Sequence, residues 1–193
     1  MNVSNTDYIS SHKFLELVDC VDQELANDWA YLIPYAFDVT QIRPDGTYYA
    51  DVHGTLLRDY KDVSIYYLPV YIEGETLQEV LVTRFEKSVE IIEQLPNISK
   101  AFVIFVGPNS PVPRHVDDHP ATLYNMLLGV RVPGSSADEV GIQIDSTVCR
   151  PARGEALIFS PTIPHHAWNK TDQWWVSIVL MADVNTLKLK EQE

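Results

Sequence analysis

The chain has 193 residues, of which 46% are hydrophobic and 21% are charged, a composition typical of a soluble globular protein. Its 14 Lys and Arg against 27 Asp and Glu give a formal net charge of −13, which disfavours nucleic acids and anionic membranes as partners. Two cysteines exclude a disulfide framework, and no stretch reaches the about 18 apolar residues that a membrane helix needs.

The first residues have no charged-then-apolar leader, so we expect a cytoplasmic protein in a reducing compartment. We expect one domain over residues 1–193, because this length suits a single core. Its expected parts are an N-terminal helix with extra strands (1–75), a supporting helix (76–96), a β core (97–184) and a short polar tail (185–193). The oligomeric state is not indicated by any pattern.

Two helices are predicted from apolar residues at three- and four-residue steps. The first covers residues 12–30, with a stripe that includes Phe14, Leu17, Val21 and Leu25. The region from 31 to 72 instead has the alternation and turn signals of strands, around Tyr48–His53 and Ser64–Leu68. The second helix runs from Thr76 to Leu95, and Pro96 ends it.

After Pro96 the hydrophobic pattern changes to period two or to continuous apolar runs, with turns rich in Pro and Gly between them. These runs predict strands at Ala101–Val106, Leu123–Val132, Gly141–Val148, Ala156–Phe159 and Trp174–Met181. Short strands at this spacing without intervening helices indicate a mostly β fold with flanking helices, either an antiparallel sandwich or a barrel.

Two clusters of histidine and aspartate suggest a metal site. His115 and Asp117 are two residues apart, so in an extended segment their side chains point the same way. His165 and His166 follow fifty residues later, after a strand-like run. Two imidazoles and one carboxylate on one face are the ligands of non-haem Fe(II) oxygenases. The alternatives are a local hydrogen bond for His115 and Asp117, and a solvated turn for the tandem histidines.

From about Tyr60 to Val184 the chain resembles the aspartyl/asparaginyl β-hydroxylase branch of the Fe(II)- and 2-oxoglutarate-dependent oxygenases. The most specific motif is Gly154-x-x-Leu157-Ile158-Phe159, a short turn and then His165-x-x-Trp168. The resemblance implies a double-stranded β-helix, which is a jelly-roll or cupin-like barrel, with iron held at one end.

The resemblance implies that His115, Asp117 and His165 are the catalytic iron ligands. His165 is preferred over His166 because it stands three residues before Trp168. The co-substrates implied are 2-oxoglutarate and dioxygen, and the reaction is hydroxylation or another oxidation of a C–H bond in a small molecule such as an amino acid.

The residues that bind 2-oxoglutarate in the family are only partly present. The family's arginine ten residues after the distal histidine is replaced by Trp175, although the serine two residues later is present as Ser177. A second family arginine corresponds to Asn125. Arg131 is the remaining candidate for a carboxylate anchor, because its strand parity matches that of Asn125; the alternative is that the strand slips by one residue and Arg131 faces solvent.

The sequence thus predicts a non-haem Fe(II) dioxygenase. One alternative is an iron-dependent oxygenase or oxidase of the same fold that does not use 2-oxoglutarate, because Trp175 cannot replace a guanidinium. A second alternative is a non-catalytic barrel that binds a metal or a ligand.

Overall fold

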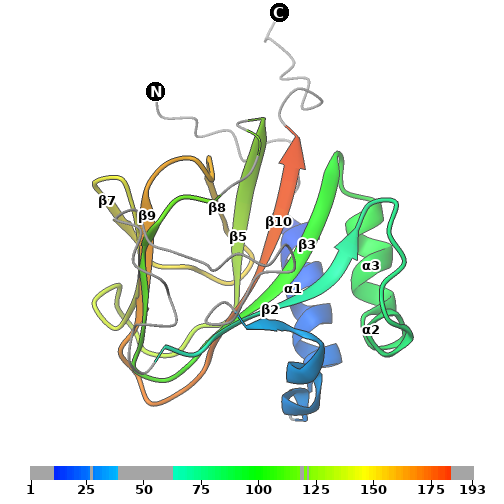
Figure 1. The fold of residues 1–193 in the computed structure, drawn as a ribbon, viewed down its shortest axis with the longest axis horizontal. Helices are drawn as coiled ribbons and strands as arrows, with labels where there is room; N and C mark the ends of the chain where they lie inside the picture. The colour runs from blue at the N-terminus through cyan, green and yellow to red at the C-terminus, as the bar shows by residue number, and fades with distance from the viewer. Residues whose placement is uncertain (1–10, 27, 39–62, 118–119, 121, 184–193) are drawn as a thin grey trace, which may run out of the picture.

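The computed structural model describes residues 11–26, 28–38, 63–117, 120 and 122–183. The expected strand at Tyr48–His53 and the expected tail at 185–193 lie outside these residues. Within them the chain forms two antiparallel sheets that face each other, with the helices against the outer face of the larger sheet (Figure 1). This is the predicted double-stranded β-helix with flanking helices.

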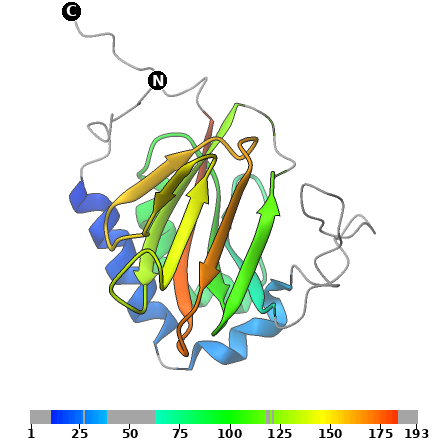
Figure 2. The same ribbon diagram turned by 90° about the vertical axis from the view of Figure 1, so that its left-hand side faces the viewer.

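The larger sheet contains, in spatial order, β1 (Phe37–Asp38), β2 (Ile65–Ile72), β3 (Ile98–Val106), β10 (Trp175–Asp183), β5 (Leu123–Arg131) and β8 (Ala156–Phe159). The smaller sheet, in front of the larger one in Figure 2, contains β4 (Ser110–His115), β9 (His165–Asn169), β6 (Val140–Ile144) and β7 (Thr147–Cys149). All neighbouring strands pair antiparallel.

The larger sheet is buried on both faces, which explains the continuous apolar runs in its sequence. Along β10, Val176, Ile178 and Leu180 belong to the core under the helices, whereas Trp175 and Val179 belong to the core between the two sheets. The core between the sheets positions the candidate site, because the histidine and aspartate clusters lie at one end of it.

The N-terminal helix α1 (Ser11–Leu25) is shorter than predicted. Its apolar stripe is buried as expected, with Leu17, Val21 and Leu25 fully inaccessible. After Ala26, which has a positive φ of 48°, the chain continues as the 3₁₀ helix η1 (Trp29–Tyr35). No helix among the described residues is long and apolar enough to cross a membrane.

The predicted helix from Thr76 to Leu95 is two helices, α2 (Glu79–Arg84) and α3 (Glu86–Glu93). Between them Phe85 leaves helical geometry, with φ −110° and ψ 27°, and its side chain is fully buried under the larger sheet. The break thus coincides with burial of the Phe85 ring, a tertiary contact that periodicity alone cannot reveal.

Two strands, β4 and β9, were not predicted, and two others, β6 and β7, were predicted as one. The proline-rich segment before His115 is β4, which tolerates prolines because it lies at the edge of its sheet. The histidine turn is β9, between β4 and β6. The predicted strand Gly141–Val148 is the hairpin of β6 and β7, which turns at Asp145, a residue with φ 52°.

We expect Phe85→Ala to lower the free energy of unfolding by about 3–5 kcal/mol, because it removes a fully buried ring. Val82→Ala, three residues earlier with a side chain that is 48% exposed, is the matched control and should cost about 0.5 kcal/mol or less. Urea denaturation of both variants measures the difference. Equal losses would contradict the role of Phe85 in the core.

Candidate metal centre

The two histidines are brought together by the register of the smaller sheet. His115 is the last residue of β4, His165 is the first residue of β9, and the two are direct partners in the antiparallel ladder. Asp117 follows two residues after β4, where its backbone N–H donates to the carbonyl of Pro161 at 2.9 Å. One end of the smaller sheet therefore carries all three side chains.

The three side chains converge on one point. Nε2 of His115 lies 3.6 Å from Oδ1 of Asp117, and Nε2 of His165 lies 3.8 Å from Oδ2 of the same carboxylate. The three potential ligand atoms all lie within 4.8 Å of one another. The imidazole rings of the two histidines are 4.3 Å apart between centroids. This spacing suits three ligands on one face of a metal ion.

The hydrogen bonds of the two imidazoles leave their Nε2 atoms free to bind a metal. Nδ1 of His115 lies 2.7 Å from the carbonyl of Pro113, and Nδ1 of His165 lies 2.8 Å from the carbonyl of Ile163. A carbonyl only accepts, so each Nδ1 must be the protonated nitrogen. The lone pair of each imidazole is then on Nε2, which faces Asp117.

Asn125 of β5 holds the carboxylate in place. Its Nδ2 donates to Oδ2 of Asp117 at 2.9 Å, and the side chain is buried. Its Oδ1 is also buried but has no hydrogen-bond partner among the described residues. A buried acceptor without a partner is costly, so this atom is suited to receive a donor from a bound ligand. The donor set of two imidazoles and one carboxylate fits a divalent metal.

The buried position of His165 favours its neutral form. Phe159 of β8 packs edge-on against the imidazole, with 5.0 Å between the ring centroids. Burial, with a smaller effect of the neighbouring His115, lowers the pKa of His165 below its usual value of 6.5. The imidazole is therefore ready to bind a metal in mildly acidic solution, where an ordinary histidine would be protonated.

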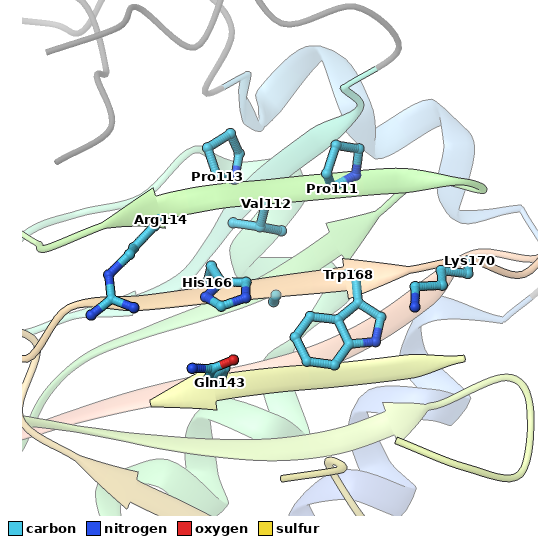
Figure 3. Close-up of a pocket in the computed structure, with 9 residues that line it drawn as sticks. Pro111, Val112, Pro113, Arg114, Gln143, His166, Trp168 and Lys170 are labelled. Carbon is cyan, nitrogen blue, oxygen red and sulfur yellow. The ribbon is translucent and has the colours of Figure 1, made fainter. Parts of the chain in front are cut away.

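His166 lies on the other face of β9, because side chains alternate along a strand. With Arg114, Gln143 and Trp168 it lines an open groove of about 490 Å³ on the outside of the smaller sheet (Figure 3). The structure thus brings His165, and not His166, to His115 and Asp117.

Arg131 does not share the face of Asn125, and this expectation is corrected. Its Nε donates to Oδ1 of Asp22 in α1 at 2.5 Å, and its guanidinium also donates to the carbonyl of Ala26 at 2.8 Å. Asp22 and Ala26 lie with the helices that cover the outer face of the larger sheet, so Arg131 joins α1 to β5 and points away from the candidate metal centre.

A β-bulge is the reason for this reversal. Ser177 of β10 pairs with Gly129, but Val176 pairs with Arg131, so Val130 is an extra residue in β5. A bulge shifts the alternation of side chains by one residue. Val130 and Arg131 therefore both lie on the side of α1, where Val130 joins the core under the helices.

Trp175 and Ser177 lie between the two sheets. Both are buried, and Nε1 of Trp175 donates to Oγ of Ser177 at 2.7 Å. Trp175 belongs to the apolar cluster that also contains Phe159. The interior end marked by Trp175 is therefore apolar and satisfies its own polar groups.

Comparison with known proteins shows the family to which the chain belongs. A family described as aspartyl/asparaginyl beta-hydroxylase matches residues 38–186. An ornithine lipid ester-linked acyl 2-hydroxylase from Rhizobium tropici is 32% identical over 92 residues, which are 48% of this chain and 31% of that protein. The match therefore spans less than a third of that relative's length.

The structural similarities are more distant. The cupin domain of Schizosaccharomyces pombe Cnp3 is 8% identical with a TM-score of 0.41, over 72% of this chain and 82% of that one. KdgF from Halomonas sp. is 12% identical with a TM-score of 0.39, over 65% of this chain and 86% of that one.

The lowered pKa of His165 predicts a pH dependence of stability in the metal-free protein. Between that pKa and 6.5 the unfolded chain binds more protons at this residue than the folded protein does. The contribution of the neutral His165 imidazole to the free energy of unfolding is fully present above about pH 6.5. It is lost as the pH falls from 6.5 through the lowered pKa. Urea denaturation at several pH values should show a shallower dependence for His165→Gln than for the wild type. The same pH dependence of stability in both proteins would contradict the lowered pKa of His165.

Proposed function

Because the chain belongs to the aspartyl/asparaginyl β-hydroxylase family, we propose that it is a non-haem Fe(II) oxygenase that hydroxylates a C–H bond of a small molecule. The observation that carries the proposal is the convergence of His115, Asp117 and His165, with ligand atoms within 4.8 Å of one another and both Nε2 atoms unprotonated. Iron held by these residues would supply the activation of dioxygen.

One side chain and two backbone carbonyls orient the three proposed ligands. Asn125 orients the Asp117 carboxylate, and the carbonyls of Pro113 and Ile163 orient the two imidazoles. Hydrogen bonds of this kind fix ligand geometry and commonly change metal affinity by about 10–100-fold. The apolar cluster behind His165 excludes water from one side of the centre, so that the substrate and dioxygen must approach from the other side.

The proposed co-substrate is 2-oxoglutarate. In the overall reaction one oxygen atom of O2 enters the C–H bond and the other enters succinate, as CO2 leaves. The substrate class is proposed by analogy with the family: a small molecule such as an amino acid. The acyl 2-hydroxylation named for the Rhizobium tropici relative supports hydroxylation of an aliphatic carbon, although that protein is much longer than the matched region.

A second candidate function keeps the iron and omits 2-oxoglutarate. It is favoured by the interior position of Trp175, which hydrogen-bonds to Ser177 and brings no cation to this end of the barrel. The substrate itself would then provide all the electrons for the reduction of dioxygen.

Replacement of any one ligand should greatly weaken metal binding without unfolding the chain. We expect His115→Ala, Asp117→Ala and His165→Ala to weaken Fe(II) binding at least about 100-fold, because each removes one of three ligands. His166→Ala, on the outer face of the same strand, is the matched control and should bind Fe(II) as the wild type does. Anaerobic titration measures the affinity. Equal effects of the His165 and His166 variants would refute the triad.

Oxygen consumption separates the candidate functions. The iron-loaded protein should consume dioxygen and release succinate when 2-oxoglutarate is added. This consumption should occur, at a slow rate, even when the primary substrate is absent. Consumption that depends on a substrate but not on 2-oxoglutarate would favour the second candidate. A protein that binds iron but consumes no dioxygen with 2-oxoglutarate or with a panel of amino acids would support the non-catalytic barrel.

A further inference from the structure

A co-substrate with two carboxylates presents an electrostatic problem to this barrel. One carboxylate can bind a metal, but the other must be paired with a cation if it is buried. The described residues of the core between the sheets are almost wholly apolar near Trp175, and its indole N–H is already donated to Ser177. A second carboxylate would lose its hydration there without compensation.

Most of the described arginines are held elsewhere by their own partners. Arg84 pairs with Asp28, and Arg131 and Arg153 pair with acidic residues of α1. Arg150 donates to backbone carbonyls, including that of Gly134 at 2.7 Å. Arg114 lines the outer groove in Figure 3, as does Lys170. None of these cations faces the space between the sheets.

Lys100 of β3 does face that space. It stands two residues before Phe102, which packs into the core between the sheets, so the two side chains leave the same face of the strand. Its cross-strand partner Met181 is two residues from Val179, another member of that core. Lys100 is partly exposed, and no described residue forms a hydrogen bond or an ion pair with its ammonium.

Lys100 also lies at the same level of the barrel as the candidate metal centre. Met181 pairs with Lys100 on one side and with Asn125 on the other, and Asn125 donates to Asp117. Lys100 and Asn125 are therefore two strands apart, about 10 Å between their backbones. The flexible four-carbon stem of lysine can bring the ammonium into this interval.

We propose that Lys100 is the cation that binds the far carboxylate of a 2-oxo diacid co-substrate. The inference rests on the proposed function, because the other end of the acid must bind the metal at His115, Asp117 and His165. The anchor of the co-substrate thus comes from β3, at the level of the metal, and not from the positions of Trp175 and Arg131. A charge-assisted contact to a carboxylate is among the stronger polar interactions in proteins.

The test is isothermal titration of the full chain loaded with Mn(II), which permits binding without turnover. The probes are 2-oxoglutarate and pyruvate, which shares the 2-oxo acid group but lacks the far carboxylate. We expect Lys100→Met to raise the Kd of 2-oxoglutarate at least about tenfold, which corresponds to about 1.4 kcal/mol, and to leave that of pyruvate unchanged. Lys100→Arg should retain most of the 2-oxoglutarate affinity, because it keeps the charge.

Lys170→Met is the matched control, because it removes a lysine from the outer groove. It should bind both acids as the wild type does. Lys100→Gln provides a second variant should Lys100→Met fail to fold. Unchanged 2-oxoglutarate affinity in the Lys100 variants, or equal loss for both acids, would overturn the role of Lys100 and leave the iron centre standing. Failure of the wild type to bind Mn(II) would instead overturn the proposed function itself.

Discussion

The pairing of β4 with β9 is the constraint on which the candidate site depends. It places His115 opposite His165, and a slip of one residue would bring His166 to the inner face in its place. The far end of β9 fixes this register through Asn169, which is buried. Its Nδ2 donates to the carbonyls of Val106, Gly107 and Gln173, and its Oδ1 accepts from Thr171. A slipped strand would leave these buried groups without partners.

The parts of the site that the sequence predicts are those set by local alternation. His115 and Asp117 share a direction because they are two residues apart, and His165 is separated from His166 because neighbours on a strand face opposite ways. The same alternation explains why Trp175 and Ser177, two residues apart, both lie between the sheets. In each case the side-chain direction follows from a few residues of regular chain, without knowledge of distant contacts.

The parts that the sequence did not reveal depend on contacts between distant segments. The bulge at Val130 turns Arg131 toward Asp22, more than a hundred residues earlier, and no local signal marks it. The break at Phe85 similarly reflects burial against the larger sheet. The proximity of Lys100 to Asn125 cannot be predicted from the sequence, because it follows only from the strand order β3, β10, β5.

The two ends of the space between the sheets differ in what they require from a ligand. Around Trp175 and Ser177 the polar groups are satisfied by each other, so a charged ligand gains nothing there and would be desolvated. At the level of Asn125, the buried Oδ1 has no hydrogen-bond partner among the residues that the structure describes, and Lys100 extends from the same level. With a divalent metal bound, the positive charges here outweigh the single carboxylate of Asp117. This local excess can attract a small acid despite the net charge of −13, because surface charges beyond about 10 Å are largely screened at physiological salt.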